Sequence, residues 1–91
     1  MRIQFDPLGW DDFCHWIETD PRTLARLREI IRDTRRNPFS GIGKPEPLKG
    51  EWQGFWSRRI TREHRLVYRV TGTGDTQILQ IAMCRYHYER R

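Results

Sequence analysis

The stretch RLVYRVT, residues 65–71, alternates between two kinds of side chain. One side of the stretch carries Leu66, Tyr68 and Val70. The other side carries Arg65, Val67 and Arg69. Successive side chains of a β-strand point to opposite faces of a sheet, so a period of two indicates a strand. We expect one face of this strand to meet the core and the other to present its arginines to solvent.

Two further strands are predicted around this stretch, over residues 55–60 and 77–86. Turn-forming residues separate the three strands, at 61–64 and at 72–75. Near the amino end, residues 2–5 form a short additional strand candidate. The carboxyl-terminal half of the chain is therefore predicted to be mainly β-structure.

Two helices are predicted in the amino-terminal third. Residues 8–18 carry apolar side chains at helical spacing. A second helix opens at Asp20-Pro21, an N-cap followed by proline at the first helical position, and ends before Asn37-Pro38. This order of elements predicts an α+β fold, with two N-terminal helices packed on one face of a mainly antiparallel twisted sheet. We expect a single domain over residues 1–91.

Composition points to a small domain with a basic surface. Charged residues make up 32% of the 91 residues and the formal net charge is +5. Of the 17 basic residues, fifteen are arginine. Arginine binds phosphate groups through a planar fork, so this bias favours a nucleic-acid or phosphate partner. A soluble, arginine-rich surface without such a partner is the alternative.

Features of membrane-bound and exported proteins are missing from the sequence. No apolar run approaches the roughly 18 residues that suggest a membrane-spanning helix. No basic segment followed by an apolar region opens the chain, as it would in a secretory signal. We therefore expect a cytoplasmic protein without a membrane partner. Cys14 and Cys84 fall in predicted helix and strand and are interpreted as buried thiols, and whether they touch is open.

Residues 38–54 form a long loop with three prolines and four glycines. Loops of this length in a small domain are either functional or disordered. Within it Glu46 lies between Pro45 and Pro47, which restrict the backbone on both sides. A carboxylate held this stiffly suits a general base, because proton abstraction needs hydrogen-bond reach. A polyproline-like surface turn explains the same residues.

The predicted open face of the sheet carries Arg65, joined by Arg59, Arg69 and Arg85. These arginines are either an ordinary solvated surface or a phosphate cradle that stabilises charge in a transition state. His87, near the end of the chain, is either a structural residue or an acid–base group. Because neighbouring strand residues face opposite ways, His87 and Tyr88 can share a site only if the chain end bends.

A metal centre is not supported by the ligand count. The chain has two cysteines and three histidines, with no pair of histidines at helical ligand spacing. A structural zinc site needs four ligands. We therefore predict no metal and no cofactor.

Several spaced segments together resemble the YoeB (Txe) toxins, which belong to the RelE superfamily of type II toxin–antitoxin systems. The segments that carry this resemblance are 33–39 (DTRRNPF), 43–49 (GKPEPLK), 54–61 (GFWSRRIT), 63–68 (EHRLVY) and 84–88 (CRYHY). They follow one another in order over nearly the whole chain. The resemblance implies the RelE-like microbial RNase fold.

The resemblance also implies an activity, that of a ribosome-dependent mRNA endonuclease, or mRNA interferase. Such toxins cleave the codon in the ribosomal A site without a metal and so inhibit translation. By the same resemblance Glu46 is the general base, Arg65 stabilises the transition state and His87 is the general acid. Tyr88 also contributes to catalysis.

Basic residues around these positions are expected to hold the RNA backbone: Lys44, Lys49, Arg59 and Arg85. The resemblance further implies a cognate Phd/YefM-type antitoxin that wraps the toxin, operator DNA bound through the toxin–antitoxin complex as co-repressor, and a toxin homodimer. Family members usually end at or near the final tyrosine, whereas here the tail Glu89-Arg90-Arg91 follows. That tail either folds over His87 or adds RNA contacts.

A non-catalytic RNA- or DNA-binding module is the alternative function. Binding alone predicts that Glu46→Gln leaves the phenotype intact, since losing a negative charge strengthens contact with a polyanion. Catalysis predicts that the same change abolishes growth arrest while RNA binding persists.

Overall fold

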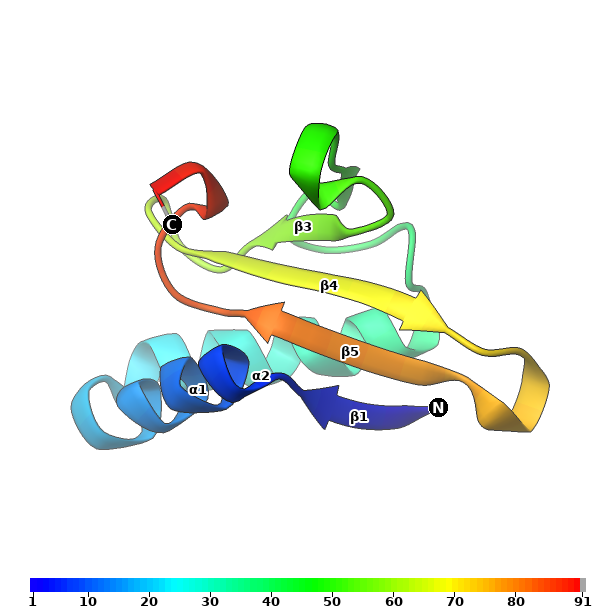
Figure 1. Cartoon of the computed structure of the whole chain (residues 1–91). Coiled ribbons are helices and arrows are strands. Elements are labelled where there is room, and N and C mark those ends of the chain that lie inside the picture. Colours follow the sequence, from blue (N-terminus) through cyan, green and yellow to red (C-terminus); the bar gives the residue numbers. More distant parts are fainter. Residues whose placement is uncertain (91) are drawn as a thin grey trace.

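The structure, a computed structural model, describes residues 1–90. Arg91, the last residue of the predicted tail, lies outside the described residues. Figure 1 shows a layer of two helices against one face of a twisted sheet, with a short helical turn and the chain end on the other face. This arrangement confirms the predicted α+β fold.

The helices lie close to their predicted positions. α1 spans Pro7–Thr19 and α2 spans Pro21–Arg36. Asp20 caps α2, because its side chain accepts a hydrogen bond from the backbone N–H of Thr23. That bond lowers the pKa of the Asp20 carboxyl. Neither helix among the described residues is long and apolar enough to cross a membrane.

The sheet has the strand order β1-β5-β4-β3-β2. β1 (Arg2–Phe5) pairs with β5 (Ile78–Met83) in parallel, and the other pairs are antiparallel. β4 spans Arg65–Thr71, as the alternation predicts, and β3 spans Trp56–Arg59, within the predicted range of residues 55–60. The edge strand β2, Glu46–Pro47, lies inside residues 38–54, which the sequence predicts to be a loop. The loop prediction is therefore wrong for these two residues.

The last strand is shorter than predicted. The sequence suggests extended chain over residues 77–86, whereas β5 ends at Met83. The chain turns at Tyr86, which adopts a left-handed backbone conformation with φ of 63°. Side chains of Asp12, Trp16 and His64 take most of the backbone hydrogen bonds of residues 84–86, and β4 contributes one, from the Arg65 N–H to the Tyr86 carbonyl, so the regular ladder stops early.

Each face of the sheet has its own apolar cluster. The helix-covered face holds the main core, including Trp16, Leu27, Leu66 and Ile81. On the opposite face a smaller cluster is formed by Leu48, Val67, Ala82 and Met83, with Trp52, Phe55 and Tyr88 packed against it. The expectation that this face only presents arginines to solvent is therefore incomplete, because the loop and the chain end partly cover it.

Candidate active site

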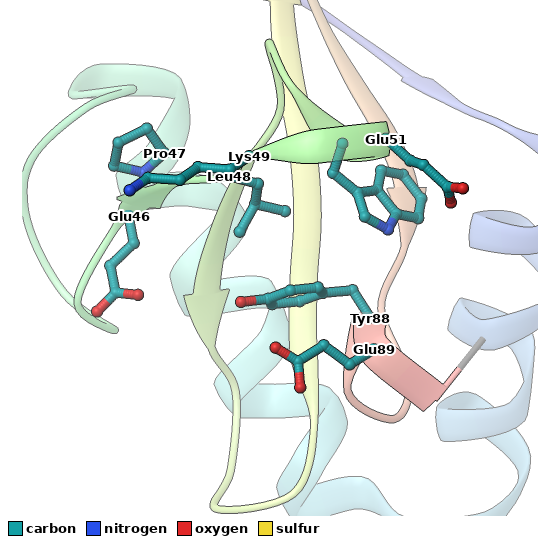
Figure 2. A pocket seen from close by; sticks show the side chains of 8 residues that line it. Glu46, Pro47, Leu48, Lys49, Glu51, Tyr88 and Glu89 are labelled. Atoms are coloured by element: carbon teal, nitrogen blue, oxygen red, sulfur yellow. The ribbon is translucent and has the colours of Figure 1, made fainter.

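A hollow of about 680 Å³ lies on the sheet face opposite the helices. Two segments far apart in sequence meet in it, one around β2 and one at the chain end. In Figure 2 the ring of Tyr88 lies below Leu48, and its hydroxyl points to the side on which Glu46 lies. The lining residues are Glu46, Pro47, Leu48, Lys49, Glu51, Trp52, Tyr88 and Glu89.

Glu46 is fixed in the hollow by strand pairing as well as by its two neighbouring prolines. Glu46 lies opposite Ser57, and Pro47 lies opposite Trp56. Beyond the prolines, the N–H of Leu48 donates to the carbonyl of Phe55 at 2.9 Å. The Glu46 side chain remains exposed to solvent. A solvent-exposed carboxylate on a fixed backbone can receive a proton from a bound ligand.

Arg58, whose side chain has 0% exposure, organises the loop that precedes β2. Its guanidinium pairs with Asp33 of α2 at 2.7 Å. It also donates to Tyr68 Oη and to the carbonyl oxygens of Asn37, Ser40 and Ile42. The bond from Arg58 lowers the pKa of the Asp33 carboxyl, whereas burial raises the pKa of the Tyr68 hydroxyl. The loop is therefore wrapped around a buried cation.

Two of the predicted arginines face each other across neighbouring strands. Arg59 of β3 lies opposite Arg65 of β4, two residues along from the Ser57–Val67 pair. Side chains two positions apart share a sheet face, so both arginines lie on the face that carries the hollow. Arg65 Nη1 donates to the carbonyl oxygens of Thr61, Arg62 and His64 in the β3–β4 turn. The turn thus fixes the Arg65 guanidinium through its Nη1 atom.

The end of the chain is held where it leaves the sheet. The backbone N–H of Cys84 donates to Asp12 Oδ2 at 3.0 Å, and Trp16 Nε1 donates to the Cys84 carbonyl at 2.8 Å. The N–H of Tyr86 donates to His64 Nδ1 at 2.8 Å. Asp12 and Trp16 belong to α1, and His64 immediately precedes β4. These contacts produce the bend that a shared site for residues 87 and 88 requires.

His87 and Tyr88 lie beside each other after this bend, with their ring centroids 4.3 Å apart. Tyr88 lines the hollow, and the half-buried His87 does not belong to its lining. The N–H of Glu89 donates to His87 Nδ1 at 3.3 Å, and a Glu89 carboxylate oxygen lies 4.0 Å from the same nitrogen. The first tail residue therefore contacts His87, as one of the two expectations for the tail requires.

Two predicted RNA-binding residues lie away from the hollow lining. Arg85 stacks on the ring of Tyr86 at 4.5 Å, and its Nε atom is buried without a hydrogen-bond partner among the described residues. Lys44 precedes β2 in a left-handed conformation with φ of 51° and is exposed. Of the predicted site residues, the lining of the hollow includes Glu46, Lys49 and Tyr88. It does not include Lys44, Arg59, Arg65, Arg85 or His87.

Sequence reasoning missed the residues that hold this arrangement in place: Asp12, Trp16, Asp33, Arg58 and His64. A signal existed for Arg58. Arg58 lies two residues from both Trp56 and Ile60, and residues two apart in a strand share a face. This register places Arg58 on the core side of β3, opposite to the side of Arg59. His64 and Asp12 carry no comparable local signal, because their partners are backbone groups more than 20 residues away.

In residues 1–90, no group of three or more His, Cys, Asp and Glu side chains gathers as metal ligands would. Cys14 is half-buried and Cys84 is buried, with the Cys84 thiol 3.5 Å from the carbonyl oxygen of Gly9.

Comparisons with known proteins give one consistent result. A family model for the YoeB-like toxin of bacterial type II toxin–antitoxin systems matches residues 5–88. Toxin YoeB of Escherichia coli O6:H1 is 58% identical over 88 residues, covering 97% of this chain and 100% of that toxin. The match therefore includes both the loop and the chain end that border the hollow.

Solved structures agree with the sequence comparisons. The YoeB/ParE toxin from Agrobacterium tumefaciens superimposes with a TM-score of 0.92 at 50% identity, covering 97% of this chain and 100% of that one. Two Staphylococcus aureus structures, a heterotetrameric YoeB–YefM toxin–antitoxin complex and a YoeB dimer, match with TM-scores of 0.83 and 0.82. Each is 39% identical and covers 97% of this chain and 98% of its own.

Proposed function

Because this chain belongs to the YoeB-like toxins of bacterial type II toxin–antitoxin systems, we propose that it is a ribosome-dependent mRNA endonuclease. It enters the ribosomal A site in the cytoplasm, cleaves the codon there and stops translation. The observation that carries the proposal is the hollow itself. Glu46, Lys49 and Tyr88 line it, on the sheet face that also carries Arg59 and Arg65.

Cleavage proceeds by internal attack within the RNA. Glu46 removes the proton of a ribose 2′-hydroxyl, and the 2′-oxygen attacks the adjacent phosphorus. The bond from phosphorus to the 5′-oxygen breaks, and His87 donates the proton that this oxygen takes up. The products are a 2′,3′-cyclic phosphate and a free 5′-hydroxyl. Glu46 gains one proton and His87 loses one, and all other atoms of the products come from the RNA.

Arginine supplies the electrostatic part of this mechanism. The phosphorane-like transition state carries extra negative charge, which Arg65 stabilises with the guanidinium donors that the turn does not use. Tyr88, packed against the smaller apolar cluster, borders the reacting group and helps to orient it. Lys44, Lys49, Arg59 and Arg85 contact the RNA backbone, which contributes affinity that falls with salt.

The proposed partners follow from the family. A YefM-type antitoxin binds this chain, as one does in the S. aureus complex, and the pair binds operator DNA as a co-repressor. The chain also forms a homodimer, as the S. aureus YoeB structure does.

The test is primer extension on a defined mRNA bound to purified ribosomes. Wild type should give a new stop at the A-site codon that requires ribosomes. Glu46→Gln should lower the cleavage rate by about 10²–10⁴-fold, the range for loss of a general base. Glu51→Gln is the matched control, because Glu51 lines the same hollow and the charge change is identical.

Binding without catalysis gives a different outcome. In that case neither wild type nor Glu51→Gln cuts the message, and Glu46→Gln arrests growth as well as wild type does. Absence of a ribosome-dependent stop with wild type would end the endonuclease proposal.

A further inference from the structure

The backbone of Tyr86 is held on both sides by two consecutive residues. Its N–H donates to His64 Nδ1 at 2.8 Å, and its carbonyl accepts from the N–H of Arg65 at 3.0 Å. A ladder bond would need a backbone acceptor opposite the Tyr86 N–H, and here an imidazole nitrogen takes that place. The bond therefore depends on the chemistry of one side chain.

This bond lies at the point where the chain changes direction. Tyr86 has a φ of 63°, a left-handed conformation that costs a residue with a Cβ atom about 1 kcal/mol or more. Such a conformation persists only where neighbouring contacts impose it. After this residue the chain returns over the sheet, and Tyr88 packs against the cluster of Leu48, Val67 and Met83.

We propose that His64 is a positioning residue whose neutral imidazole holds the bend at Tyr86, and that protonation of His64 releases the chain end, moving Tyr88 out of the hollow and His87 away from its place beside it. The neutral ring accepts the Tyr86 N–H at Nδ1. Once protonated, Nδ1 carries its own hydrogen, and two donors then face each other. The effect on cleavage rests on the proposed function, whereas the effect on the chain end does not.

The surroundings of His64 favour the neutral, accepting form. Its ring meets the edge of Trp16 at a centroid distance of 4.7 Å and lies 5.9 Å from the Tyr86 ring. Burial lowers the pKa of His64 from its ordinary value of 6.5. The charged and titratable groups that face it are Asp12 and His15 of α1, Glu63 of the turn and Arg85 of the chain end.

These charges act in both directions but leave burial as the largest influence. Glu63 and Asp12 favour the protonated ring, whereas Arg85 and His15 disfavour it. The site is thus held together near neutral pH and is expected to open as the pH falls below 6.5.

Two substitutions of His64 distinguish its role as a hydrogen-bond acceptor from the packing of its aromatic ring. His64→Phe keeps an aromatic ring against Trp16 but cannot accept the Tyr86 N–H. His64→Asn loses the ring but can place an amide oxygen near the position of Nδ1, and it does not titrate. His15→Phe is the control, because His15 also contacts Trp16, at 4.8 Å, and its side chain makes no bond to the chain end among the described residues.

The first measurement is by NMR and needs no RNA. Contacts between the Tyr88 ring and the methyl groups of Leu48 and Met83 should be present in wild type, His15→Phe and His64→Asn. They should be lost in His64→Phe, while a cooperative thermal unfolding transition shows that this variant is still folded. If His64→Phe keeps these contacts, the positioning role is wrong, whether or not the protein cleaves RNA.

The second measurement is cleavage of ribosome-bound mRNA under single-turnover conditions. His64→Phe should lose on the order of 10–100-fold in rate with unchanged ribosome binding, as expected when reacting groups are misplaced. His64→Asn should stay within a few-fold of wild type near neutral pH and lose less rate than wild type as the pH falls below 6.5. Identical acid limbs for these two proteins would overturn release by protonation.

The two measurements also separate this inference from the proposed function. If the Tyr88 contacts respond as expected but wild type makes no cut, His64 holds the chain end and the endonuclease proposal fails. If wild type cuts and His64→Phe cuts at the same rate, the positioning role fails and the endonuclease proposal stands.

Discussion

The loop over residues 37–43 closes around a buried charge, whereas the chain end over residues 84–88 is held by side chains that reach out to its backbone. Arg58 lies inside the loop and donates to its carbonyl oxygens and to Asp33. At the chain end Asp12, Trp16 and His64 each make a bond to a backbone group. Both segments lead into the same hollow, but by different chemistry.

This difference predicts how each segment responds to its surroundings. The arginine side chain is charged over the whole pH range in which proteins stay folded. The bond from Arg58 holds the pKa of Asp33 below the ordinary value of 3.8. The chain end depends partly on His64, which titrates much closer to neutral pH. The loop that carries Glu46 is therefore the permanent half of the site, and the segment that carries His87 is the half that can be released.

Removing the buried cation should have the largest effect on stability. Arg58→Met leaves Asp33, with 16% of its side chain exposed, without its partner and leaves the loop carbonyls unbonded. Breaking a buried ion pair in this way typically costs 3–5 kcal/mol. Because Asp33 is partly exposed, we expect the free energy of unfolding to fall by about 3 kcal/mol in urea denaturation.

The control for this prediction is the next residue along β3. Arg59→Met removes an equal charge from an exposed position and should change the unfolding free energy by no more than about 0.5 kcal/mol. Equal midpoints for the two variants would mean that Arg58 does not anchor the loop.

Weakening the hold on the chain end should have a smaller effect. Trp16→Phe removes the indole N–H that donates to the Cys84 carbonyl and part of a buried ring. We expect a loss of about 2 kcal/mol, from the lost hydrogen bond and a small cavity. Trp10→Phe makes the same change at a tryptophan that is 51% exposed and should cost well under 1 kcal/mol.

Thermal melts and urea titrations of these two variants, side by side, measure the difference. Should both variants unfold at the wild-type midpoint, the bond from Trp16 contributes nothing to holding the chain end, and the contrast between the two segments would lose one of its supports.

The regular elements could be predicted from the sequence because their signals are local. The Asp20-Pro21 pair marks the start of α2, Asn37-Pro38 marks its end, and the alternation from Arg65 onward defines β4. Glu46, which lines the hollow, was also a candidate, since the two prolines that flank it are visible in the sequence itself.

What the sequence did not show depends on contacts between distant residues. The strand β2 has only two residues, and its pairing with Ser57 and Trp56 defines it. The early end of β5 and the bend at Tyr86 are imposed by side chains of α1 and of the β3–β4 turn. No propensity of residues 84–88 encodes that conformation, because a tyrosine rarely adopts a positive φ by itself.

The smallest expected effect is the response of the two segments to mild acid. Because burial holds the pKa of His64 below 6.5, the folded state binds fewer protons at this residue than the unfolded state does. The contribution of His64 to stability is therefore complete above 6.5 and is lost as the pH falls from there through the lowered pKa. For Asp33 the contribution is present above 3.8 and is lost only as the pH falls through its own lowered value.

As the pH falls below 6.5 but stays above 3.8, only the chain end should therefore loosen. The amide resonance of Tyr86 should move in an NMR titration over this range, whereas the amide of Ile42, which donates to Asp33, should stay in place. The decisive comparison is with His64→Asn, in which the Tyr86 resonance should move much less. If the Ile42 amide moves together with that of Tyr86, the two segments form one cooperative unit, and the distinction between a permanent and a releasable half of the site does not hold.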